Sequence, residues 1–171
     1  INAIVSHLDK GQFDFPRNSS FRYDPIIKKC YQLADTLQTL NGELITLCRD
    51  VGTKGQLGGQ AHLFNSKGVW RDLVNHVNTM ASNLTSQVRE VSTIAKAVAE
   101  GDLSQKMTMQ VSGEVHELKL TLNNMVDQLT VFSTEVHRVA EEVGTQGLLG
   151  GQAAVPNARG KWKSLTHAVN T

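Results

Sequence analysis

One segment of the chain occurs twice, and it decides the fold. The first copy, residues 51–79, reads VGTKGQLGGQAHLFNSKGVWRDLVNHVNT, and the second, residues 143–171, reads VGTQGLLGGQAAVPNARGKWKSLTHAVNT. Shifted by 92 residues, the two copies align without a gap and are identical at 16 of 29 positions. A weaker relative, GDLSQKMTMQVSGEVHELKLTLNNMVDQL, begins half-way between them at Gly101. The chain is therefore built from repeated units of about 46 residues.

Each unit opens a connector with a glycine, and two apolar residues follow at fixed distances. The leading glycines are Gly55, Gly101 and Gly147. The residue two positions after each glycine is a leucine: Leu57, Leu103 and Leu149. The residue eight positions after each glycine is also apolar: Leu63, Met109 and Val155. We expect the glycines to cap the preceding helices in the left-handed conformation. The recurring apolar residues predict connectors pinned against the helices; the alternative is a flexible linker with incidental hydrophobic residues.

Between the connectors, apolar residues recur with alternating spacings of three and four. This rhythm runs from Ile26 to Val51, from Trp70 to Val98 and from Val115 to Val143, and begins again at Trp162. It is the heptad pattern of helices that pack side by side. Connectors of about 14 residues are long enough to return along a helix, which favours parallel consecutive helices. We predict an all-α fold of tandem units, in which a homodimer forms parallel four-helix bundles and successive units share long helices.

Composition excludes several other functions. A net charge of +1 over 171 residues argues against a nucleic-acid binder. The longest stretches without Asp, Glu, Lys or Arg have 16 residues, too few for a membrane helix. The first residue is Ile1, so we expect a piece of a longer, intracellular chain. Cys30 and Cys48 form no zinc motif, and the six histidines have no metal-ligand spacing.

We also expect neither a cofactor site nor a catalytic site. The run from Gly55 to Gly59 is glycine-rich, but it lacks the lysine with which a P-loop binds phosphate. Trp70 and Trp162 stand at the starts of helices, where we expect them to anchor the connectors, with ligand stacking as the alternative.

The middle unit resembles the HAMP domain, the dimeric four-helix relay module of sensor kinases and chemoreceptors. The residues that carry the resemblance are Gly101-Asp102-Leu103-Ser104, Gly113-Glu114-Val115, Leu118, Asn123 and Met125. Glu114 matches the acidic residue that opens the second helix in this family. The flanking units depart from the pattern, since each has Gly-Gly-Gln-Ala in its connector, at residues 58–61 and 150–153.

The alternation of ordinary and glycine-rich units resembles the poly-HAMP array of fungal group III hybrid histidine kinases. The resemblance implies a cytoplasmic array ahead of a kinase core, in a parent histidine kinase of osmotic and stress signalling and fungicide response. Its partners would be a second copy of the chain and the kinase core. The expected units are a divergent unit (1–40, connector about 11–25), a first glycine-rich unit (41–86, connector 55–69), an ordinary unit (87–132, connector 101–114) and a second glycine-rich unit (133–171, connector 147–161).

Signal relay is the function that this organisation predicts. A shared helix must pass a change of packing from one unit to the next or absorb it at the junction. Glycine lowers the cost of alternative backbone states, so we expect the glycine-rich units to be softer than the ordinary one. Two alternatives remain: a passive dimeric coiled-coil spacer, and a small-molecule-sensing module within the array.

Overall fold

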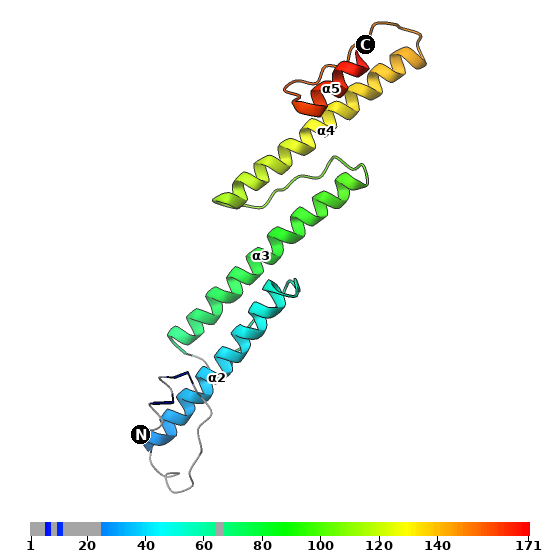
Figure 1. Cartoon of the computed structure of the whole chain (residues 1–171). Helices are drawn as coiled ribbons and strands as arrows, with labels where there is room; N and C mark the ends of the chain where they lie inside the picture. The colour runs from blue at the N-terminus through cyan, green and yellow to red at the C-terminus, as the bar shows by residue number, and fades with distance from the viewer. Residues whose placement is uncertain (1–5, 8–9, 12–24, 64–66) are drawn as a thin grey trace. The chain divides into compact units, whose positions relative to one another are not determined.

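The computed structural model describes residues 6–7, 10–11, 25–63 and 67–171. Within these ranges the chain forms four helices and no strand, which confirms the all-α prediction (Figure 1). The helices are α2 (Pro25–Gly52), α3 (Val69–Ala99), α4 (Glu114–Gly144) and α5 (Gly160–Val169). None of them is long and apolar enough to cross a membrane. The connector expected at about residues 11–25 lies, apart from its two end residues, outside the described part.

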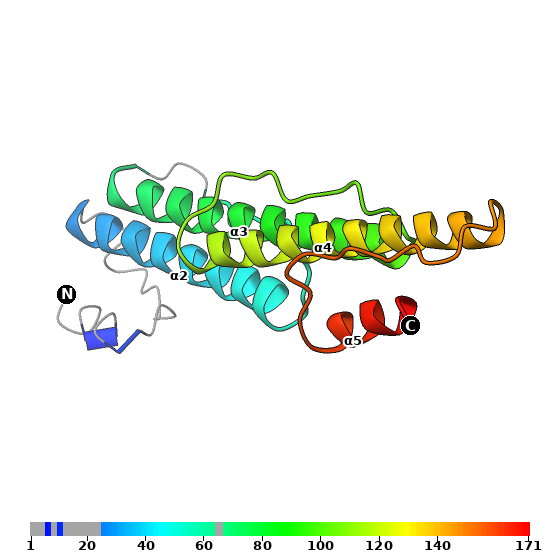
Figure 2. The same cartoon turned by 90° about the horizontal axis from the view of Figure 1, so that it is seen from above.

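The chain divides into two compact bodies, Ile1–Ser86 and Gln87–Thr171. The division falls within α3. Inside each body a connector runs back along the helix that precedes it, so that the next helix starts again at the same end (Figures 1 and 2). The helices joined by a connector are therefore parallel, as the connector length predicts. We call residues 53–68, 100–113 and 145–159 the first, second and third connectors.

All three leading glycines have positive φ, but only Gly101 caps its helix directly, since Gly55 and Gly147 stand three residues after the ends of α2 and α4. Gly101 has φ 83°, and Asp102 N–H donates to the carbonyl oxygen of Ala97 over 2.8 Å. This is the Schellman arrangement, which satisfies carbonyl groups left free at a helix end. Gly55 and Gly147 both have φ 66°. At these two ends the equivalent hydrogen bond spans six residues, so the two glycine-rich units share a cap that differs from the ordinary one.

The cores of two units combine buried residues of both helices with one residue of the connector between them. In the ordinary unit, Ile94 of α3, Met107 of the second connector and Val126 of α4 form a buried cluster. The corresponding cluster of the first glycine-rich unit is made of Leu40, Leu47, Ala61, Val74 and Ala81. At the buried connector position the ordinary unit has a methionine, where its neighbour has an alanine.

The most deeply buried connector residue stands six residues after the leading glycine, at a position for which the sequence predicted no role. Ala61, Met107 and Ala153 are 2%, 1% and 4% exposed. Leu63, Met109 and Val155, the residues expected to pin the connectors, are only half-buried. The reason is that Ala61, Met107 and Ala153 lie between the two helices of their units, whereas the residues two positions later lie at the edge of the space between these helices.

Part of the heptad seam is not covered within one chain. The exposed apolar seam residues include Ile26, Leu33, Leu73, Met80, Leu84, Leu118, Met125 and Val143. Along each helix, these exposed residues alternate with the residues that pack against the connectors. A single chain therefore buries the connector-facing side of its helices and leaves an apolar stripe on each long helix.

Candidate functional site: the clamped connectors

In the three units whose connectors are described, an asparagine on the second helix, or at its C-cap in the case of Asn170, binds the most deeply buried connector residue. Met107 N–H donates to Asn123 Oδ1 over 2.8 Å, and Asn123 Nδ2 donates to the Met107 carbonyl over 3.1 Å. The same pair of hydrogen bonds joins Ala61 to Asn78, at 2.8 and 2.9 Å. It recurs between Ala153 and Asn170, at 2.6 and 3.0 Å. One planar amide thus satisfies both backbone groups of one residue, much as a neighbouring β-strand does.

A glutamate on the first helix of each unit binds the next connector residue. His62 N–H donates to Glu43 Oε2 over 2.7 Å. Thr108 N–H donates to Glu90 Oε1 over 2.8 Å. Ala154 N–H donates to Glu135 Oε2, also over 2.8 Å. Two consecutive connector residues are therefore attached to two different helices. We call each set of one glutamate and one asparagine a clamp.

The clamps solve a problem that burial of the connector creates. An extended segment between two helices has no neighbouring strand, so its N–H and C=O groups would be buried without partners. Each unsatisfied buried group costs about 1–3 kcal/mol. The asparagine and glutamate side chains supply the missing partners and at the same time fix where the connector lies against both helices.

Charged side chains hold the ordinary connector at further points. Lys119 Nζ, on α4, donates to the Met109 carbonyl over 2.8 Å and to the Thr108 carbonyl over 3.3 Å. At the start of this connector, the Asp102 carboxylate accepts hydrogen bonds from the hydroxyl and the backbone N–H of Ser104, which lower the pKa of Asp102. Glu90 of α3 and Lys119 of α4 therefore bind the same two residues of the second connector, Thr108 and Met109.

The glycine-rich connectors, besides their clamps, pack closely against the first helix of the unit. A Cβ atom on Gly59 would lie 3.3 Å from Leu47 Cδ1, and one on Gly151 would overlap the Glu142 carboxylate. Gly58 and Gly150, which precede them, have φ 98° and 103°, a region that favours glycine. The glycine pair thus turns the backbone and lets it approach the first helix of the unit.

Arg138 reinforces the clamp of the second glycine-rich unit. Its guanidinium contacts Glu135 at 2.8 Å and Glu142 at 2.7 Å, and donates to the Gln152 carbonyl over 2.8 Å. The hydrogen bonds from Arg138 and, secondly, from Ala154 N–H lower the pKa of Glu135 to about 2. The two carboxylates raise the pKa of Arg138 in turn. Glu135 is therefore held as a carboxylate at neutral pH.

The residues singled out from the sequence have different surroundings. Leu57 and Leu103 are half-buried, whereas Leu149 is 87% exposed. Thr130, 27 residues after Leu103, hydrogen-bonds the Leu103 carbonyl over 3.4 Å.

The helix starts also contain predicted residues. Trp70 packs against the core of the first glycine-rich unit. Trp162 contacts Phe132 edge to face, with ring centres 5.5 Å apart. Glu114 is exposed in the first turn of α4, where a negative charge favours the helix N-terminus.

The clamps were not predicted from the sequence. The clearest sequence signal for them is that Glu43 and Glu135, like Asn78 and Asn170, are separated by the 92-residue period. These polar residues flank the seam instead of lying on it, so a search for apolar periodicity passes over them. Asn123 was among the residues that carry the resemblance to the HAMP domain, but no role was predicted for it.

Residues 65–130 match the HAMP domain family. The match begins just before α3, includes the second connector with its clamp, and ends within α4. No solved structure matches the chain. The chain therefore contains a HAMP domain, a non-catalytic module that serves as a signal-relay linker in sensor kinases and similar receptors.

Proposed function

We propose that this chain is a cytoplasmic relay segment of a hybrid histidine kinase, in which stacked HAMP units pass a conformational change to a kinase core. The matched HAMP domain supports relay in general. The more specific proposal, a poly-HAMP array of the fungal group III type acting in osmotic and fungicide response, is supported by the 92-residue alternation of unlike units and their repeated phrases.

The observation that carries this proposal is that one helix serves two connectors. The first half of α4 contributes Asn123 and Val126 to the second connector. Its second half contributes Glu135, which binds the third connector, and the buried Val139. A helix transmits displacement along its axis because its backbone hydrogen bonds make it stiff. A shift of α4 against one connector therefore also displaces its contacts with the other.

The two contact sets lie on different faces of α4. Thirteen residues separate Val126 from Val139, which corresponds to about 1,300° of helical rotation, or roughly 220° after whole turns are removed. Rotation of α4 about its axis thus moves the two residues in nearly opposite directions. Relay requires two packing arrangements whose free energies differ by no more than a few kcal/mol. Because adjacent units share α4, the arrangement that one unit adopts affects the arrangement of the other.

We further propose that a second copy of the chain completes each unit as a parallel homodimer. Support comes from the exposed seam residues, which keep the heptad spacing of packed helices although no helix in the described part of the chain covers them. Met80 and Met125, at 63% and 43% exposure, lie on this stripe. A partner helix would remove them from water.

The relay proposal is tested by loosening the connector in the parent kinase without disturbing the seam. Met107→Ala removes the side chain between α3 and α4; Leu120→Ala removes a leucine of similar size from an exposed position on α4. We expect the first variant to change the autophosphorylation response to stimulus and the second to leave it unchanged. A passive spacer would tolerate both, provided that each variant still folds and dimerises.

A further inference from the structure

Two adjoining hollows lie between the first connector and α3, inside the N-terminal body. Their volumes are about 430 Å³ and about 230 Å³, and they share the side chains of Asn75 and Asn78. The larger hollow alone is within the volume range of small-molecule sites. We call the two hollows together the outer groove.

The outer groove lies on the side of α3 that faces away from the seam. Asn75 stands two residues after Leu73, which is an exposed seam residue. Ser82 likewise stands two residues before the exposed seam residue Leu84. Two residues correspond to about 200° of rotation around an α-helix. A second copy of the chain that covers the seam therefore leaves the outer groove open.

The larger hollow is lined by uncharged polar side chains alone. They are four carboxamides and two hydroxyl groups, from Gln60, Asn75, Asn78, Thr79, Ser82 and Asn83. Asn78 is used by the clamp, and the Thr79 hydroxyl donates to the Asn75 carbonyl over 2.8 Å. The side chains of Gln60, Ser82 and Asn83 make no hydrogen bond within the described part of the chain. Carboxamides and hydroxyls both donate and accept, so this lining suits a ligand with several hydroxyl groups.

The smaller hollow adds a positive charge at one end of the outer groove. Arg71 and His62 line it. The Arg71 guanidinium forms no ion pair or side-chain hydrogen bond with any described residue. The Glu43 carboxylate binds the His62 backbone N–H as part of the clamp and does not line the hollow. A guanidinium presents a fork of N–H donors that matches the oxygen atoms of a phosphate.

The ordinary unit has an ion pair at the corresponding place. One position before the buried connector residue stands Lys106 in the ordinary unit and Gln60 in the first glycine-rich unit. Four positions after the clamp asparagine stand Asp127 and Ser82, respectively. Lys106 Nζ lies 2.6 Å from Asp127 Oδ1, so this pair joins the second connector to α4. In the glycine-rich unit the neutral Gln60 and Ser82 instead border the larger hollow.

We propose that the outer groove binds a small polyhydroxylated phosphate ester, such as a sugar phosphate, with its hydroxyl groups on Gln60 and Ser82 and its phosphate on Arg71. The ligand joins the first connector to α3 at the place where the ordinary unit has its ion pair, and so stabilises the glycine-rich unit. An effect on kinase output rests on the relay proposed above, whereas binding itself does not. The second glycine-rich unit repeats the glutamine and the positive charge 92 positions later, as Gln152 and Lys163.

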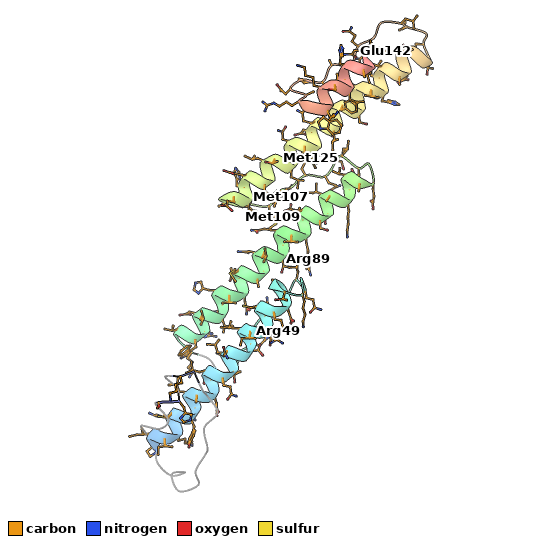
Figure 3. All side chains as sticks on the ribbon, in the orientation of Figure 1. Arg49, Arg89, Met107, Met109, Met125 and Glu142 are labelled. Carbon is orange, nitrogen blue, oxygen red and sulfur yellow. The ribbon has the colours of Figure 1, made fainter. Side chains whose placement is uncertain are left out.

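The first test is isothermal titration calorimetry of the 171-residue chain with glucose 6-phosphate, with glucose and with inorganic phosphate. We expect the ester to bind at least about tenfold more tightly than glucose or phosphate, because it alone reaches both hollows. Arg71→Gln should reduce the affinity for the ester to that for glucose. Arg49→Gln serves as the control, since Arg49, labelled on α2 in Figure 3, is exposed and lines neither hollow.

The second test transfers the ion pair of the ordinary unit. Gln60→Lys combined with Ser82→Asp places a lysine and an aspartate at the positions of Lys106 and Asp127. We expect this double variant to lose binding of glucose 6-phosphate and to exchange the backbone N–H groups of residues 55–68 more slowly without ligand. In the unchanged chain, saturation with the ester should slow the same N–H groups.

Other outcomes would overturn the proposal. Equal affinities for the ester and for inorganic phosphate mean that only the charge is attracted, and equal effects of Arg71→Gln and Arg49→Gln mean diffuse attraction. Absence of saturable binding means that the outer groove is a solvated polar surface. Dissociation of the dimer during titration, followed by sedimentation, assigns the groove to the subunit interface. None of these results bears on relay, because the titrations do not involve kinase output.

Discussion

Asn123 is the residue on which the ordinary unit depends most directly, because it binds both backbone groups of the buried Met107. In Asn123→Ala these groups lose their partners, so we expect the free energy of unfolding to fall by about 1–3 kcal/mol. Urea denaturation of the 171-residue chain measures this loss. Asn124→Ala, at the exposed neighbouring position, serves as the control and should change the value by less than about 0.5 kcal/mol. Equal effects of the two substitutions would mean that the clamp contributes nothing.

Glu135 makes the second prediction at this scale. Its pKa of about 2 in the folded chain lies below the ordinary value of 4.5. A lowered pKa contributes stability above the ordinary value, and that contribution disappears as the pH falls from 4.5 towards 2. Carboxyl resonances followed by NMR during an acid titration should therefore place the midpoint of Glu135 near 2. Arg138→Gln should move it upwards, because Arg138 is the largest cause of the shift. A midpoint that does not respond to this substitution would contradict the assigned cause.

Among the structural elements, the connectors distinguish the two kinds of unit. Gly58 turns the first connector with φ 98°, a conformation that costs other residues about 1–2 kcal/mol. Gly58→Ala should destabilise the chain by that amount in urea denaturation. Gly42 lies inside α2 with open space around its Cα, so Gly42→Ala should instead stabilise the chain by about 0.5–1 kcal/mol. If both substitutions had the same sign, the account of the glycine pair would be wrong.

Hydrogen exchange measures how firmly each connector is held. The second connector is bound by its clamp, by Lys119 and by the Asp102 turn. The first is bound by its clamp, by the hydrogen bond from Gly58 N–H to Thr85 Oγ1 over 3.0 Å, and by close packing around glycine, with no charged side chain equivalent to Lys119 among the described contacts. We therefore expect the backbone N–H groups of residues 101–113 to exchange more slowly than those of residues 55–68. Equal protection of the two segments would contradict the prediction that the glycine-rich units are softer.

The helices and the left-handed glycines that follow them could be predicted from the sequence because both have strong local signals. Spacings of three and four indicate a helix whatever surrounds it, and a glycine after such a run indicates a left-handed cap. The buried connector residue could not be predicted, because Ala61 and Ala153 carry a weak apolar signal beside Leu63 and Val155. The clamps were missed for a related reason: what makes a polar residue important here is a buried backbone group far away in the sequence.

At the scale of the whole molecule, the account depends on a second chain. One chain buries its connectors but leaves part of the seam of α2, α3 and α4 in water. Two parallel copies would bury these residues against each other and turn each pair of helices into a four-helix bundle. A change of packing could then pass along the shared helices of both chains together, as relay requires.

The most direct test of this central claim is sedimentation equilibrium of the 171-residue chain over a range of concentrations. The account predicts a dimer of about twice 18.7 kDa. It also predicts that Met80→Glu, which places a charge on the seam, produces monomers. Ile45→Glu, at an exposed position off the seam, should leave the dimer intact. A folded monomer at every concentration, or dissociation by Ile45→Glu and not by Met80→Glu, would contradict the account.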